Sequence, residues 1–84
     1  MIQKPESTFY RYLVKKAVEN GCTKDYEIAS FLGLKRQNLY QLRLHPERKL
    51  QRQTLIRFAE AIGISYELLS SVYINSQRRD GYIK

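Results

Sequence analysis

The chain has 84 residues and a formal net charge of +7. This length allows one small domain, and the charge favours a polyanionic partner, either nucleic acid or an anionic membrane surface. A single cysteine excludes an intrachain disulfide and a Cys-rich zinc site. No run approaches the roughly 18 apolar residues of a membrane span, and no basic-then-apolar signal opens the chain. We therefore expect a cytoplasmic protein that does not span a membrane.

Helical periodicity predicts an all-α fold, with no strand pattern and no internal repeat. Residues 1–6 are expected to form an arm, followed by Ser7 or Thr8 as the cap of the first helix. Apolar residues then recur at three- and four-residue spacing in five segments, at about 8–20, 24–32, 35–43, 52–61 and 66–74. We expect residues 1–75 to form the domain and residues 76–84 a basic, mobile tail.

The segment from residue 25 to residue 44 carries the functional signal. Two short helical patterns meet at Gly33, which permits a backbone conformation that a side chain would resist. In the second pattern Leu39 and Leu42 define a buried face. The other faces carry Arg, Gln and Asn, which are side chains that read base edges in the major groove of DNA.

These residues carry a resemblance to a known family. Ala29, Gly33 and Leu39 stand at the spacing of the helix-turn-helix of phage repressors and Cro-like regulators. The accompanying apolar positions match as well, and they are Ile28, Leu32, Leu34 and Leu42. The segment Leu55–Ser65 is similar to that family's fourth helix and its link to a fifth. The chain from about Tyr10 to Val72 thus resembles a lambda-repressor-like helix-turn-helix domain of five helices.

The resemblance implies that the helix from residue 35 to 43 is the recognition helix. We expect base edges to be read by Arg36, Gln37, Asn38, Tyr40 and Gln41. Arginine can bond guanine in a fork, and glutamine can do the same to adenine. Asn38 reads a base or touches the backbone. Tyr40 packs on a thymine methyl group, bonds a phosphate or covers the edge of the core.

Most of the net charge lies beside this helix. Seven Lys and Arg stand against one Glu between residues 35 and 57, which is a net charge of +6. Phosphate contacts supply most non-specific affinity for DNA and make it dependent on salt. The expected phosphate-binding residues are Lys35, Arg43, Arg48, Lys49 and Arg52. Lys24 and Tyr26 are equally open to a backbone contact or to none.

The sequence departs from the family at three places. Asp25 stands where the family often has a phosphate-bonding Gln, and we expect this carboxylate to cap its helix instead. Leu42 and Arg43 replace the family's usual aromatic residue and Glu. The loop with His45 and Pro46 is about one residue longer than usual. Pro46 excludes a helix through this loop.

Members of this family usually bind palindromic operators as two-fold dimers. The apolar residues of the last predicted helix cover more than one face, so we expect a homodimer interface at Leu68, Leu69, Val72 and Tyr73. The alternative is that all of them pack within the core.

The sequence therefore predicts a transcriptional regulator that binds double-stranded DNA, acting as a repressor by occupying its operator. The alternative is an antitoxin that binds a partner toxin and its own promoter. RNA binding usually needs an aromatic platform, and membrane-surface binding needs a free amphipathic helix; the sequence predicts neither. We therefore expect a nucleoid-associated protein without a membrane partner. We expect no enzymatic activity, catalytic residue, metal, cofactor or small-molecule ligand, because the acidic residues, Cys and His form no paired constellation.

Overall fold

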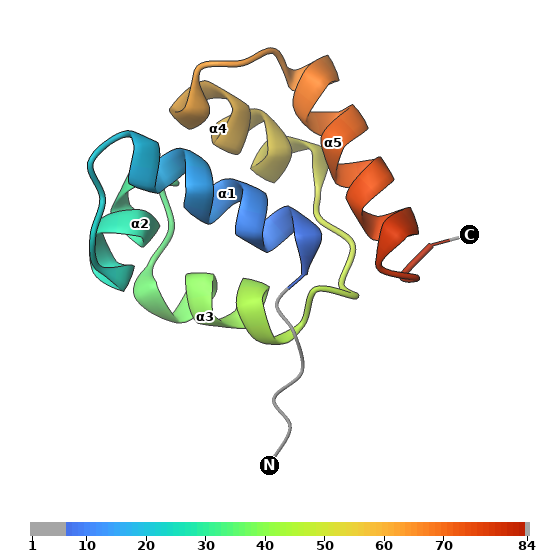
Figure 1. Cartoon of the computed structure of the whole chain (residues 1–84), viewed down its shortest axis with the longest axis horizontal. Coiled ribbons are helices and arrows are strands. Elements are labelled where there is room, and N and C mark those ends of the chain that lie inside the picture. The colour runs from blue at the N-terminus through green and yellow to red at the C-terminus, as the bar shows by residue number, and fades with distance from the viewer. Residues whose placement is uncertain (1–6, 84) are drawn as a thin grey trace.

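Helix α1 (Thr8–Glu19) crosses the centre of the fold, and four further helices surround it (Figure 1). The computed structural model describes residues 7–83, so the predicted arm at 1–6 and Lys84 lie outside the described residues. The other helices are α2 (Asp25–Phe31), α3 (Arg36–Leu44), α4 (Arg52–Ile62) and α5 (Tyr66–Arg79), with no strand in residues 7–83. The all-α fold is confirmed, and α1 to α4 begin and end within one residue of their predicted bounds.

The core forms where the apolar stripes of all five helices converge on α1. Leu13, Leu32, Phe58 and Leu69 are its largest fully buried side chains and come from α1, the end of α2, α4 and α5. The apolar spacing of α1 predicts one buried face that includes Tyr10, Leu13, Ala17 and Val18. The first three are buried, whereas Val18 is 54% exposed, so the prediction is wrong at Val18.

Helix α5 is longer than predicted. The sequence indicates an end near Ile74, whereas α5 continues to Arg79. Gln77 is only 3% exposed, and its amide nitrogen donates a hydrogen bond to the carbonyl oxygen of Pro46 at 2.8 Å. This bond satisfies a buried polar side chain, and Arg78 and Arg79 interact favourably with the carboxyl end of the helix dipole. The predicted helix end is therefore wrong, and residues 76–79 belong to α5.

The carboxyl end of α5 is joined to the amino end of α1. Both carboxylate oxygens of Asp80 accept hydrogen bonds of 2.7 Å from Thr8, one from its backbone N–H and one from its hydroxyl. The Ser7 hydroxyl accepts a third bond from the Tyr10 N–H at 3.1 Å, which confirms Ser7 as the cap of α1. Two of the otherwise unpaired N–H groups of α1 thus find acceptors, one of them far along the chain.

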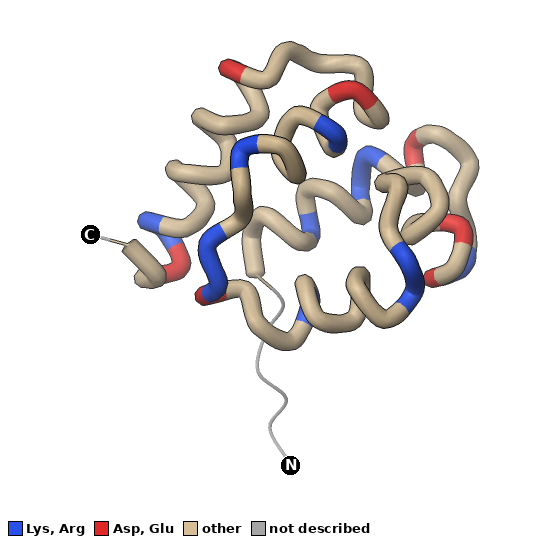
Figure 2. Tube along the Cα trace, turned by 180° about the vertical axis from the view of Figure 1, so that it is seen from behind, with Lys and Arg blue, Asp and Glu red and all other residues tan. Residues whose placement is uncertain are grey.

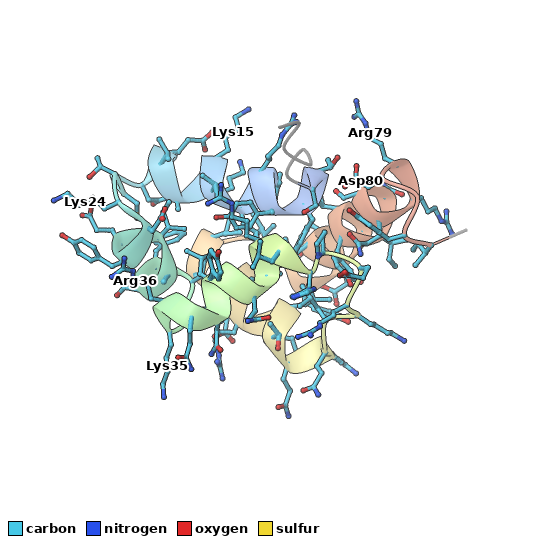
Figure 3. All side chains as sticks on the ribbon, turned by 90° about the horizontal axis from the view of Figure 1, so that it is seen from below. Lys15, Lys24, Lys35, Arg36, Arg79 and Asp80 are labelled. Carbon is cyan, nitrogen blue, oxygen red and sulfur yellow. The ribbon has the colours of Figure 1, made fainter. Side chains whose placement is uncertain are left out.

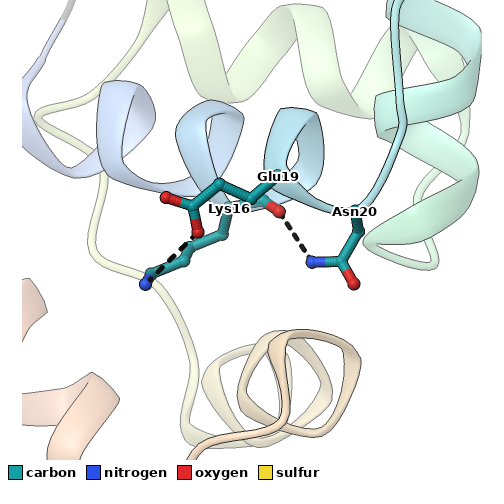
Figure 4. A network of polar contacts seen from close by, with 3 residues as sticks. All are labelled: Lys16, Glu19 and Asn20. Atoms are coloured by element: carbon teal, nitrogen blue, oxygen red, sulfur yellow. Dashed lines mark hydrogen bonds and ion pairs between the residues drawn. The ribbon is translucent and has the colours of Figure 1, made fainter.

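The opposite end of α1 is closed more locally. The Asn20 amide donates to the Lys16 carbonyl oxygen at 2.8 Å, and the Lys16 ammonium lies 3.7 Å from a Glu19 carboxylate oxygen (Figure 4). The ion pair is exposed and contributes little to stability. Across residues 7–83, no helix has both the length and the apolar character needed to cross a lipid bilayer.

Candidate nucleic-acid interface

The turn between α2 and α3 fixes the orientation of α3. The N–H of Gly33 donates to Ser30 and that of Leu34 to Ala29, at 3.1 and 2.8 Å, which closes the end of α2. Gly33 has a φ of +74°, where a side chain is strained. A Cβ atom at Gly33 would also lie 3.1 Å from the Cδ of Arg57. The positive φ therefore favours glycine at this turn, and its missing side chain leaves room for the methylenes of Arg57.

Helix α3 has one buried edge and one exposed face. Leu39 is buried and Leu42 is half-buried against the core, as predicted. The residues opposite this edge, at three-, four- and seven-residue spacing, are Gln37, Tyr40, Gln41 and Leu44, and all are exposed. We call these four residues the α3 face. Neither glutamine makes a hydrogen bond to another described residue, so both amides are available to a ligand.

Two surface hollows flank α3 and divide the predicted base-reading residues between them. Arg36, Gln37 and Tyr40 line the hollow on the side of α1 and α2, together with Tyr10, Asp25, Leu39 and Arg43. Asn38 and Gln41 line the hollow between α3, the α3–α4 loop and α4. All five predicted residues are exposed on α3, but the structure does not bring them together in one pocket.

More Lys and Arg side chains line the second hollow than the first, and the second contains no carboxylate. Arg48, Lys49 and Arg57 line it, so two of the five predicted phosphate-binding residues lie there. Figure 2 shows Lys and Arg at the start of α3, in the α3–α4 loop and along α4. An anion in this hollow would meet three positive side chains from two segments of the chain.

The remaining predicted phosphate-binding residues lie elsewhere. Lys35 is exposed and extends away from the helices, at the same end of the molecule as Lys24 and Arg36 (Figure 3). Arg43 lines the first hollow. The guanidinium carbon of Arg52 lies 5.4 Å from the ring centroid of Tyr66, which places it towards α5 and outside the second hollow. Arg57 occupies the hollow instead.

Arg57 is a residue whose place sequence reasoning missed. It counts towards the local net charge, but its neighbour in space, Gly33, is 24 positions away in the chain. No local pattern reveals that contact. The position of Arg57 on the polar side of an amphipathic helix is a signal that could have placed it among the phosphate-binding candidates. Leu44 was also missed as part of the exposed face of α3, because apolar residues are usually assigned to the core.

The helix amino ends divide into two groups. In α1 and α5 the hydroxyl of Ser7 or Ser65 accepts from a backbone N–H of the first turn. In α2 the Glu27 carboxylate accepts from the backbone N–H of the capping residue Lys24. In α3 and α4 the capping positions are Lys35 and Gln51, which make no such bond, and neither first turn contains an acidic residue. The exposed N–H groups of a helix start attract anions. The start of α4, at Gln51, lines the second hollow. The start of α3 lies at the end of the molecule where Lys24, Lys35 and Arg36 gather.

The expected cap of α2 is wrong in its identity. Asp25 makes no hydrogen bond to another described residue, and the Glu27 carboxylate takes the capping role. One Glu27 oxygen accepts from the Thr23 hydroxyl at 2.8 Å and from the backbone N–H groups of Thr23 and Lys24. These bonds, above all the one from the Thr23 hydroxyl, lower the pKa of Glu27. Glu27 reaches back over the helix start because it stands at the third helical position.

The α3–α4 loop is held by α5. The Tyr73 hydroxyl accepts a hydrogen bond from the Leu50 N–H at 3.1 Å, and Gln77 binds Pro46 as described above. Pro46 is buried and lies outside any helix, as predicted from its ring. His45 Nδ1 lies 3.6 Å from a Glu47 carboxylate oxygen. Both ends of the loop are thus anchored, which holds Arg48 and Lys49 between two fixed points.

The four residues predicted to form a dimer interface differ in how far they are buried. Leu69 is fully buried in the core, so its assignment to a dimer interface is wrong. Val72 and Tyr73 are half-buried, and the Tyr73 ring packs edge-on against Phe9 with centroids 4.9 Å apart. Leu68 is 52% exposed and is the one member of the predicted set that is exposed.

Within residues 7–83 no group of three His, Cys, Asp or Glu side chains is placed to hold a metal ion. No protein-family model, curated protein or solved structure matches the chain. The assignment of a function therefore depends on the chemistry of the α3 face and the cations around it.

Proposed function

We propose that this chain is a sequence-specific regulator of transcription that binds double-stranded DNA, with α3 in the major groove. The observation that carries this proposal is the α3 face. It presents two unpaired glutamine amides on an exposed helix, and cationic side chains lie on both flanks. An α-helix fits the major groove, where glutamine can donate to and accept from adenine.

In this proposal α2, the Gly33 turn and α3 form the helix-turn-helix of a Cro-like or phage-repressor-like protein. Gln37 and Gln41 read base edges, and Arg36 and Asn38 reach bases or backbone from the two sides of α3. Arg48, Lys49 and Arg57 bind phosphates along one strand, with the uncapped starts of α3 and α4 adding partial positive charge. Lys35 contributes charge at the other end of α3.

The proposed mechanism is repression by occupancy. A protein bound across the major groove and its flanking phosphates excludes polymerase from the same DNA. We propose that two copies bind a palindromic operator, with Leu68 and the exposed Ile74 of α5 in the contact between them. Sedimentation of the protein on a two-half-site duplex tests this part, and one chain per duplex would contradict it.

The experiment that tests the proposed function is selection of bound duplexes from a random pool. We expect enrichment of a defined half-site and, for a dimer, of a fixed spacing of about 10 base pairs or a multiple between half-site centres. Random duplex of equal length serves as the control. A protein that retains duplexes but enriches no sequence would contradict the proposal of sequence-specific regulation.

A further inference from the structure

Two exposed apolar side chains lie among the glutamines of the α3 face. Tyr40 is 57% exposed and Leu44 is 47% exposed. They are four residues apart on one helix, so they are neighbours on its surface. Single exposed apolar residues are common and need no explanation. These two lie on the same helical face as Gln37 and Gln41, and that placement calls for a ligand with both polar and apolar groups.

The surroundings of this pair indicate the charge of that ligand. Arg36 and Arg43 line the hollow on one side of α3, and Arg48, Lys49 and Arg57 line the hollow on the other. The single carboxylate in these linings is that of Asp25. An occupant of the face must therefore carry negative charge at its edges and an apolar group at its centre. A DNA major groove does so, because phosphates border it and thymine methyl groups project into it.

The glutamines and the apolar pair favour the same base pair. Glutamine bonds the N6 and N7 edge of adenine, and the thymine paired with that adenine presents its C5-methyl group in the same groove. We infer that Tyr40 and Leu44 read thymine methyl groups, and that they select A·T pairs beneath the second half of α3. This inference rests on the proposed function and names the bases that the same surface reads.

Deoxyuridine in place of thymine tests the inference, because it removes the methyl group and keeps every hydrogen-bonding group. The full chain is titrated with a duplex selected from a random pool and with copies in which single thymines are replaced. Replacing a thymine that contacts Leu44 or Tyr40 should weaken binding about two- to fourfold, as burial of one methyl group predicts. Thymines outside the half-site should have no effect.

Three variants assign the effect to side chains. Leu44→Ala and Tyr40→Ala each remove an apolar contact, and Tyr40→Phe is the control for the Tyr40 ring. Leu44→Ala should bind the thymine duplex more weakly than the wild type and lose the difference between thymine and deoxyuridine at one position. Tyr40→Phe, which removes only the hydroxyl, should keep the whole methyl effect. Both residues are exposed, so unchanged thermal unfolding midpoints serve as the folding control.

The outcomes separate this inference from the proposed function. If the chain prefers its selected duplex but tolerates deoxyuridine at every half-site thymine, methyl reading is wrong and DNA regulation stands. The inference is also overturned if the methyl effect persists unchanged in both Leu44→Ala and Tyr40→Ala. If the chain shows no preference over random duplex, the proposed function and the inference fall together.

Discussion

The two ends of this molecule treat their polar side chains in opposite ways. At the α1–α5 junction, formed by Ser7, Thr8 and Asp80, polar groups bind backbone or side chains of the same chain, and Gln77 of α5 likewise binds the α3–α4 loop at Pro46. On the α3 face, Gln37 and Gln41 have no such partners. Polar groups that are satisfied internally stabilise a fold. Those held on a rigid helix without partners are suited to an external ligand, and this contrast is the basis of the proposed function.

The same contrast appears in the helix starts. At the amino end of α1, the hydroxyl of the preceding Ser7 and the carboxylate of the distant Asp80 accept hydrogen bonds from backbone N–H groups. The amino ends of α3 and α4 receive no side-chain acceptor and have basic residues beside them. Capping would stabilise α3 and α4 by about 1 kcal/mol each. Neither helix has a side-chain cap, and cationic side chains lie beside both starts, so a phosphate of the proposed DNA ligand could act as the acceptor.

The largest expected effect lies at Gln77, which joins α5 to the α3–α4 loop. Gln77→Ala removes a buried side chain and leaves the Pro46 carbonyl oxygen without its 2.8 Å bond. The free energy of unfolding should fall by about 2–4 kcal/mol. Chemical denaturation measures it, and Asn75→Ala, an exposed amide on the same helix, should change stability by less than about 0.5 kcal/mol. Equal small losses in both variants would show that the bond from Gln77 to Pro46 does not stabilise the fold.

The next effect concerns the α3 face, where the expectation is reversed. Gln37→Ala should leave stability within about 0.5 kcal/mol of the wild type, because the side chain is exposed. Binding to the selected duplex should weaken by about 1–3 kcal/mol, with a much smaller change on random duplex. Fluorescence anisotropy with both duplexes measures the difference. Equal losses on the two duplexes would remove Gln37 from the base-reading set.

A smaller effect is expected at the cationic border. Arg57→Gln keeps the first methylenes of the side chain near the Gly33 turn but removes one of the three cationic side chains of the second hollow. The slope of log affinity against log salt should fall by about 0.9, which corresponds to one phosphate contact on duplex DNA. Arg79→Gln, on the side of the molecule away from Lys24 and Lys35 (Figure 3), is the matched control and should leave the slope unchanged. Identical slopes in wild type and Arg57→Gln would contradict the phosphate contact.

The smallest effect is a pH dependence of stability at α2. The bonds to Thr23 and Lys24 lower the pKa of Glu27 in the folded chain, so this group stabilises the fold above the ordinary pKa of a glutamate. That contribution is lost as the pH falls through the lowered pKa. In Glu27→Gln the unfolding midpoint should therefore decline less on acidification than in the wild type. Parallel declines in thermal melts of the two proteins would argue against the cap.

The sequence predicted the helices well because each carries its own apolar periodicity. Leu39 and Leu42 identified the buried edge of α3, and hence its exposed face, from local spacing alone. The end of α5 could not be predicted in this way. Asp80 and Thr8 are 72 positions apart, and Gln77 and Pro46 are 31 apart, so polar residues that resemble a solvated tail are ordered by distant partners.

The candidate site was predicted in composition better than in arrangement. Residues 36–41 are exposed on α3 except for Leu39, as the pattern requires. Arg57 lines the second hollow, whereas the predicted Arg52 does not. This difference arises because α4 brings Arg57 against the Gly33 turn, a contact that no local sequence pattern encodes. Leu69 and Leu68 are neighbours in sequence, but the rotation of α5 buries the first and exposes the second. Resemblance to Cro-like regulators stays a prediction.

The central claim is that the α3 face and its cationic border bind duplex DNA, while the α1–α5 junction does not. Chemical-shift mapping of backbone amides during titration with the selected duplex tests this most directly. We predict the largest shifts in α3, in the α3–α4 loop and at the start of α4, with small shifts around Thr8 and Asp80. Shifts concentrated at the junction, or absent from α3 while the duplex is bound, would contradict the proposed function.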